Sequence, residues 1–274
     1  METQGSLWCA TDKFMLVYPQ LETGALTQFP VLKTRRQRTV INRAGDGSTI
    51  RIADPAAETT EWLLSYVDLS DDEAEALRAF FEAAEGTLQS FTFLDPAGNL
   101  LAHSEQLNNE AWQRDPLLNM TEGVMDPKGG TAAWQLRNQG AGDQRVSQAL
   151  TAPGDYQYCF SAYVRSATPA SVWISIAGHT IEKAVTTEWT RVSVSGPGDP
   201  AATSVHFAVT VPAGTAVEIF GLQAEAQCGA SGYMASTRGG VYENAHLGED
   251  VLTISRTSEN RNSCTVKIIH ANHL

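Results

Sequence analysis

One group of side chains in this sequence is suited to holding a carbohydrate. The group consists of Tyr163, Arg165, Trp173 and His206. By the two-residue alternation of a β-strand, each points away from the apolar positions of its own segment. An exposed aromatic ring offers a platform for the C–H face of a sugar, while arginine and histidine donate hydrogen bonds to its oxygens. If the three segments are neighbours, these residues line one glycan-binding face; the alternative is that the face packs on another layer or subunit.

No pattern typical of an active site accompanies this group. The sequence has no nucleophile elbow, P-loop, zinc-peptidase motif or dinucleotide-binding fingerprint. A glycosidase needs two carboxylates at a defined separation, which one sequence does not specify. Asp126 and Asp143 lie in glycine-rich loops, but no run of alternating oxygen ligands indicates calcium. His270 and His273 lie at the chain end, where fraying explains them better than a metal does. We expect no enzymatic activity, no cofactor and no metal.

The cysteines do not form a recognisable metal or disulfide pattern. They are Cys9, Cys159, Cys228 and Cys264, with no C-x-x-C pair among them. Cys159 lies in an apolar segment and is predicted to be a small core residue. The sequence leaves any disulfide pairing open, although a reducing cytoplasm disfavours one.

Charge and hydropathy narrow the classes of partner. The 274 residues carry a net charge of −12, which argues against nucleic acid as a partner. One basic cluster stands out, made of Lys33, Arg35, Arg36, Arg38, Arg43 and Arg51. It is interpreted as a solvated strand face or a contact with an acidic partner subunit. No apolar run is long enough to cross a membrane, and the first residues do not resemble a secretory signal.

Residues 101–237 are predicted to form a β-sandwich or jelly roll, because short β-like runs alternate there with Gly/Pro turns. Alternation assigns a set of apolar residues to its interior: Phe160, Ala162, Val164, Val172, Ile174, Ile176, Val205, Phe207, Val209 and Val211. Trp134 and Trp189 are predicted to be core residues too.

Residues 1–100 are predicted to be β-rich with one helix, over residues 70–85. Ser70 and Glu73 fit a capping box, and Gly86 fits the left-handed position after the helix. The residues 44–47, Ala-Gly-Asp-Gly, predict a hairpin turn between two strands. Phe80 and Phe81 are adjacent on the helix, so their side chains point about 100° apart. We therefore expect one to face the core and the other a neighbouring subunit.

One series of elements resembles the amino-terminal domain of phage distal tail or tail-tip proteins. It consists of the helix, the glycine after it, the aromatic strand of residues 91–94 and the Asp95-Pro96 pair. The resemblance covers residues 14–100. Family members often carry basic residues just before the glycine, whereas this chain has Ala83, Ala84 and Glu85. The resemblance implies a homo-oligomeric ring, a hexamer, that contacts the tail tube and the tail-tip hub.

Residues 101–237 resemble the carbohydrate-binding-module-like jelly rolls of phage tail and receptor-binding proteins. The resemblance is carried in order by the segments 103–105 with Trp112, 126–134, 158–165, 187–192, 220–225 and 232–237. It implies a sandwich that binds glycan or decorates a virion, and it implies no catalysis.

The last residues, 238–274, contain two strand candidates that a jelly roll does not need. We expect them to return to the first domain, which makes residues 101–237 an insertion. The chain is thus predicted to be mainly β: a tail-type domain with one α-helix plus a β-sandwich. The predicted function is a structural ring component of a tail tip, located in the virion and assembled in the host cytoplasm. The alternatives are a free-standing carbohydrate-binding protein and a polysaccharide-degrading enzyme.

Overall fold

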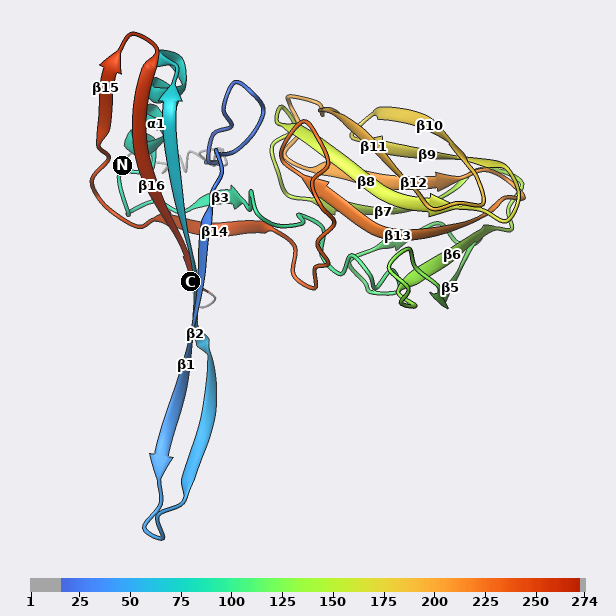
Figure 1. The fold of residues 1–274 in the computed structure, drawn as a ribbon, viewed down its shortest axis with the longest axis horizontal. Coiled ribbons are helices and arrows are strands. Elements are labelled where there is room, and N and C mark those ends of the chain that lie inside the picture. The colour runs from blue at the N-terminus through green and yellow to red at the C-terminus, as the bar shows by residue number, and fades with distance from the viewer. Residues whose placement is uncertain (1–15, 272–274) are drawn as a thin grey trace, which may run out of the picture.

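The computed structural model describes residues 16–271 and is mainly β, with three antiparallel sheets and one helix in this range (Figure 1). The predicted fold class is confirmed. The first sheet has the order β1-β2-β16-β14-β3, with β15 also paired to β16. Its strands are β1 (Leu32–Arg43), β2 (Thr49–Leu69), β3 (Phe91–Leu94), β14 (Val241–Leu247), β15 (Ile254–Ser258) and β16 (Arg261–Ala271).

The other two sheets face each other as a sandwich. We call them the β9 sheet, of order β10-β9-β12-β7-β4, and the β8 sheet, of order β11-β8-β13-β6-β5. Their strands are β4 (Gln113–Arg114), β5 (Leu118–Val124), β6 (Ala133–Asn138), β7 (Gln144–Leu150), β8 (Gln157–Arg165), β9 (Ala170–Ile176), β10 (His179–Val185), β11 (Thr190–Pro197), β12 (Val205–Val211) and β13 (Ala216–Glu225).

The sandwich core is made by the alternation that the sequence predicts. All ten apolar residues assigned to the interior are fully buried, and Trp134 is buried with them. Trp189 is only half-buried. The rings of Tyr158 and Phe160 meet Phe207 from the facing sheet, with centroids 5.8 and 5.7 Å apart. Removing these surfaces from water is the main force that holds the two sheets together.

The chain enters and leaves the sandwich at one junction, between β3 and β14. The sandwich also contacts residues 18–26: the Tyr156 hydroxyl donates to the Tyr18 carbonyl at 2.7 Å, and Leu26 packs into the sandwich core. The Gly240 N–H donates to the carbonyl oxygens of Asn99 and Leu100, at 3.0 and 3.2 Å. The buried Asn99 side chain reaches into the sandwich, where its amide donates to the Leu222 carbonyl at 2.8 Å. A Cβ at Gly239 would lie 2.5 Å from the Leu100 carbonyl oxygen. The outgoing and returning segments therefore touch, and the strands of residues 241–271 lie in the same sheet as β1, β2 and β3.

Helix α1 (Asp71–Ala83) packs on one face of the first sheet and begins where the sequence predicts. The Ser70 hydroxyl accepts from the Glu73 N–H, and the Glu73 carboxylate accepts from the Ser70 N–H, which completes the capping box. After the helix, both Glu85 and Gly86 adopt left-handed backbone. The core beneath the helix is aromatic, and its largest fully buried side chains include Tyr18, Trp62, Tyr66, Phe91 and Phe93.

The hairpin of β1 and β2 extends beyond the rest of the molecule (Figure 1). Its turn spans residues 44–48, where the Ala44 N–H donates to the Ser48 carbonyl at 2.9 Å. Within the described residues, strand β16 pairs with β2 as far as Thr59, and beyond that point β2 pairs with β1 alone. We call residues 37–58 the arm. Seven residues of β1 lie beyond Arg36, which gives the arm a length of roughly 23 Å.

Several strands have no counterpart in the sequence prediction, notably β7, β10 and β14. The exposed edge strand β10 shows little apolar alternation, with most of its residues open to solvent. Strand β14 pairs with both β16 and β3, although its own sequence has few β-branched residues. Long-range pairing, rather than local preference, makes these segments strands.

Candidate functional site

The four predicted carbohydrate-binding residues do not share one face. Tyr163 and Arg165 lie on β8, whereas Trp173 and His206 lie on β9 and β12 of the opposite sheet. All four side chains point outward, as alternation predicts. Because they belong to two different sheets, they lie on opposite sides of the sandwich. The expectation of one continuous face is therefore corrected by the strand order, which alternation alone does not reveal.

The outer side of the β8 sheet has aromatic rings whose faces are already covered. The Arg191 guanidinium lies 5.5 Å from the centroid of the Tyr163 ring, and the Arg165 guanidinium lies 4.7 Å from that of Trp189. Arg165 also forms an ion pair with Glu218. These cation–π and ionic contacts use the groups that a sugar would need.

The outer side of the β9 sheet is different, because Trp173 lies in the middle of it without such cover. The residues directly beside Trp173 on the neighbouring strands are Glu182 and Thr210, and Arg145 is next in the same row. The adjacent row consists of the small side chains Thr180, Ser175, Ala208 and Ser147, with the longer Gln113 at its edge. The half-buried indole thus stands above a low surface rimmed by one acid, one hydroxyl and one guanidinium.

The indole of Trp173 also lacks the internal contacts that Trp62, Trp112 and Trp134 make. The indole N–H of Trp62 donates to the Asp95 carboxylate at 3.1 Å. Those of Trp112 and Trp134 donate to the backbone carbonyls of His103 and Glu105, at 3.0 and 2.9 Å. Trp189, whose ring lies under Arg165, likewise has no hydrogen-bond partner for its N–H, but that N–H is buried. In residues 16–271, the Trp173 N–H has no hydrogen-bond partner and is not buried, and its ring has no aromatic or cationic partner. A tryptophan with an open face and a free donor is poised for a ligand. His206 is exposed on the same side, four residues from Thr210 along β12, roughly 13 Å away.

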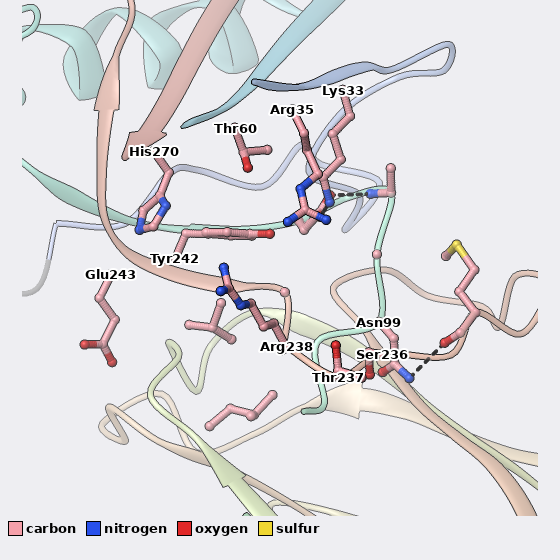
Figure 2. Close-up of a pocket in the computed structure, with 18 of the residues that line it drawn as sticks. Lys33, Arg35, Thr60, Asn99, Ser236, Thr237, Arg238, Tyr242, Glu243 and His270 are labelled. Atoms are coloured by element: carbon pink, nitrogen blue, oxygen red, sulfur yellow. Dashed lines mark hydrogen bonds and ion pairs between the residues drawn. The ribbon is translucent and has the colours of Figure 1, made fainter. Parts of the chain in front are cut away.

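A cleft of about 1020 Å³ lies where the first sheet meets the sandwich (Figure 2). Lys33 and Arg35 of β1, Arg238, Tyr242 and His270 project toward it. Sequence reasoning did not find this cleft, since its residues come from distant parts of the chain. Lys33 and Arg35 belong to the basic cluster of the sequence, and His270, for which the sequence predicts fraying, is held in β16 against the Tyr242 ring.

The charges in this cleft are largely neutralised within the protein. Lys33 pairs with Asp95, whose side chain is almost fully buried and also accepts from the Trp62 indole N–H. The buried Glu58 pairs with Arg35 and lies 3.6 Å from Arg238. Burial, followed by the charge of Arg238, lowers the pKa of His270. Because its cations already have carboxylate partners, the cleft serves first as the polar contact between the two parts of the molecule.

The two phenylalanines of α1 have separate surroundings. Phe80 is buried, with its ring centroid 4.9 Å from that of Phe91 and 5.2 Å from that of Tyr18. Phe80 is therefore the member of the pair that faces the core, which leaves Phe81 as the candidate for a subunit interface. Phe81 is half-buried and lines a groove of about 380 Å³ with Leu252 and Ile254.

The remaining candidate groups have structural explanations. Burial would raise the pKa of Asp126, but N–H donors from Ala132, Lys128 and Gly130 lower it overall, and the carboxylate holds its own loop together. Burial raises the pKa of the Cys159 and Cys264 thiols, so neither is an activated nucleophile. No cluster of metal-ligating side chains occurs within residues 16–271. Cys9 and His273 lie outside that range.

Comparison with known proteins finds partial matches only. No protein-family profile and no curated protein matches the chain. The enzymatically active domain of tailspike protein 4 of bacteriophage CBA120 is 14% identical over 48% of this chain, with a TM-score of 0.38. The match spans 22% of that tailspike chain. A CBM22-1 xylan-binding domain from Paenibacillus barcinonensis is 16% identical over 49% of this chain and 97% of its own, with a TM-score of 0.38.

A C-terminal family 22 carbohydrate binding module from Clostridium thermocellum is 16% identical over 50% of this chain and 99% of its own. Its TM-score is 0.40. In the part of the chain that the structure describes, no helix has the length and apolarity needed to cross a membrane.

Proposed function

We propose that this protein is a non-catalytic structural subunit of a phage or phage-like tail tip. In this proposal it forms a ring at the end of the tail tube, contacts the tail-tip hub, and carries a sandwich that binds glycans on the host surface. Its place is then the virion, reached by assembly in the host cytoplasm. A hexamer is the ring size that the resemblance of residues 14–100 implies.

The observation that carries the binding part is the open indole of Trp173. Its half-buried ring and free N–H lie beside Glu182, Thr210 and Arg145, which offer both acceptors and donors to sugar hydroxyls. The small residues of the adjacent row leave room for a flat sugar ring beside the indole. Tyr163 and Arg165 are left out of this site, because Arg191 and Glu218 already engage them.

The assembly part is supported by features of the first sheet. Its arm projects from the body with apolar side chains open to solvent, among them Ile41 and Ile50 at 51% and 55% exposure. An isolated two-stranded hairpin is marginally stable in water. A subunit built into a larger particle gives such a segment something to pack against.

The binding part is tested on a glycan array with the purified full-length protein and its Trp173→Ala variant. A single site is expected to bind near-millimolar, about −4 kcal/mol, and ring assembly would raise the apparent affinity through avidity. Tyr163→Ala is the matched control, because it removes an aromatic ring from the opposite face. We expect Trp173→Ala to abolish binding and Tyr163→Ala to preserve it. Equal binding by all three proteins would show that the β9 sheet is not the site.

The assembly part is tested by negative-stain imaging of the purified protein and of virions labelled with an antibody against this chain. Rings in the first sample and label at the tail tip in the second support the proposal. A monomer that binds glycan would favour a free-standing binding protein. Release of new reducing ends from a bound polysaccharide would favour an enzyme.

A further inference from the structure

The arm of β1 and β2 lacks the acidic excess of the rest of the protein. The arm, residues 37–58, contains three basic and three acidic side chains, whereas the whole chain has a net charge of −12. Arg38 pairs with Asp54, and Arg36 and Arg35 pair with Glu61 and Glu58 at the base of the arm. Arg43 and Arg51, near the tip, have no ion-pair partner within residues 16–271. Asp46, in the turn between them, has no ion-pair partner there either, so Arg43, Arg51 and Asp46 together give the tip a net charge of +1.

The strand register places an apolar residue between these two charges. Ile41 lies directly opposite Arg51, and Arg43 is two residues further along the same face of β1. Ile41 is 51% exposed. One face of the tip is thus an aliphatic side chain flanked by two arginines, at the end of an arm that no other part of the described chain covers.

A groove of complementary character lies at the opposite end of the same sheet. It is lined by Phe81 of α1, by Leu252 and Ile254, and by Arg78 and Glu82 at its rim. Its volume of about 380 Å³ admits a branched aliphatic side chain.

The surface around the groove is apolar and acidic. The Thr87 N–H donates to the Asp250 carboxylate at 2.7 Å, which ties two segments together beside the helix. Their neighbours Leu88 and Val251 are 65% and 70% exposed. Glu82 and Glu249 are exposed and have no ion-pair partner in the part of the chain described. Exposed leucine and valine side chains beside unpaired acids are typical of a docking surface.

We propose that the arm tip of one copy docks into the α1–β15 groove of a second copy. Ile41 enters the groove against Phe81, Leu252 and Ile254. Arg43 and Arg51 then face the unpaired acids, of which Glu82 lies at the rim. This inference rests on the assembly part of the proposed function and names the two surfaces that meet.

The geometry explains why the partner is another copy. The arm and the groove lie at opposite ends of the first sheet, so an arm does not reach the groove of its own chain (Figure 1). A contact between two different surfaces of identical subunits is head-to-tail, and it closes into a ring when the rotation allows. The opposite charges attract, whereas two arm tips or two grooves would repel each other.

The test is a charge exchange in the full-length protein, followed by sedimentation velocity over a concentration series. Arg51→Glu and Glu82→Arg each place like charges across the contact, and each is expected to weaken assembly by about tenfold. The double variant Arg51→Glu/Glu82→Arg is expected to restore it. An equimolar mixture of the two single variants should also assemble, because original and exchanged contacts alternate. The matched control is Arg114→Glu, the same charge change on an exposed strand of the sandwich.

A second pair of variants tests the apolar part of the contact. Ile41→Ser is expected to weaken assembly. Ile181→Ser is not, because it removes an isoleucine side chain that is exposed on β10 of the sandwich, at 36% against 51% for Ile41. Circular dichroism establishes that each variant is folded. Unchanged assembly in both charge variants, or a loss that neither the double variant nor the mixture restores, overturns this docking mode only. A wild-type protein that stays monomeric at every concentration overturns the ring as well.

Discussion

Replacing Phe80 with alanine should destabilise the first sheet strongly, and replacing its neighbour Phe81 should not. Phe80 is 7% exposed, and its ring meets Phe91 and Tyr18 edge-on. Truncating a buried phenylalanine costs about 3–5 kcal/mol, of which each aromatic contact contributes about 0.5–1.5 kcal/mol. Phe81 borders a groove and is half-buried, so we expect its truncation to cost about 1 kcal/mol.

The two losses can be separated by urea denaturation at a protein concentration that keeps the chain monomeric. With a slope of about 2 kcal/mol per molar urea, a loss of 3–5 kcal/mol lowers the midpoint by about 1.5–2.5 M. Fluorescence of Trp62, whose ring is 5.0 Å from that of Phe93, reports on the core that contains Phe80. The sandwich has a separate core and is expected to keep its own transition. Equal midpoints for Phe80→Ala and Phe81→Ala would refute the assignment of Phe80 to the core and Phe81 to the surface.

The remaining predictions concern domain organisation and pH. Residues 99–238 expressed alone should unfold cooperatively. A fusion of residues 1–98 to 240–274 should be soluble, because the two ends of the sandwich touch at Gly240 and Asn99. A fragment 1–98 that is soluble and unfolds cooperatively by itself would contradict this prediction, since it lacks β14 and β16. The free energy of unfolding should fall as the pH drops below about 6.5. Burial and the charge of Arg238 lower the pKa of His270 in the folded protein, so His270 is protonated at a higher pH in the unfolded chain than in the folded one. The midpoint of urea unfolding measured from pH 8 to pH 5 checks this, and a His270→Gln variant with the same pH dependence as the wild type would show that His270 is not responsible.

Local features of this protein are readable because their causes lie within a few residues. The capping box of Ser70 and Glu73 and the hairpin turn at residues 44–48 each depend on bonds between close neighbours in the chain. Alternation likewise assigns Phe160, Ile174 and Phe207 to the interior, because a strand turns every second side chain to the same side. The class of the fold follows from the same short-range patterns.

The position of each strand within a sheet depends instead on partners far along the chain. Alternation shows that Tyr163 and Trp173 both point outward, but only the pairing of β8 with β13, and of β9 with β12, puts them on opposite sides of the sandwich. The covering of Tyr163 by Arg191 and the open indole of Trp173 follow from that pairing. Helical spacing shows that Phe80 and Phe81 diverge, and the position of Phe91 and Tyr18 decides which of them is buried.

The arm and the interdomain cleft are decided by tertiary structure for the same reason. Nothing in the residues of β1 and β2 indicates that, among residues 16–271, β16 pairs with β2 only up to Thr59 and leaves the rest of the hairpin projecting. The cleft brings Lys33, Glu58 and Arg238 together from three distant segments. By itself the sequence determined which residues turn inward, where the helix begins and where the first hairpin turns, because those outcomes depend on neighbouring residues. Which outward-facing side chains stay open to a ligand or a second copy was decided by long-range strand pairing, because a side chain is exposed only where no distant segment packs over it.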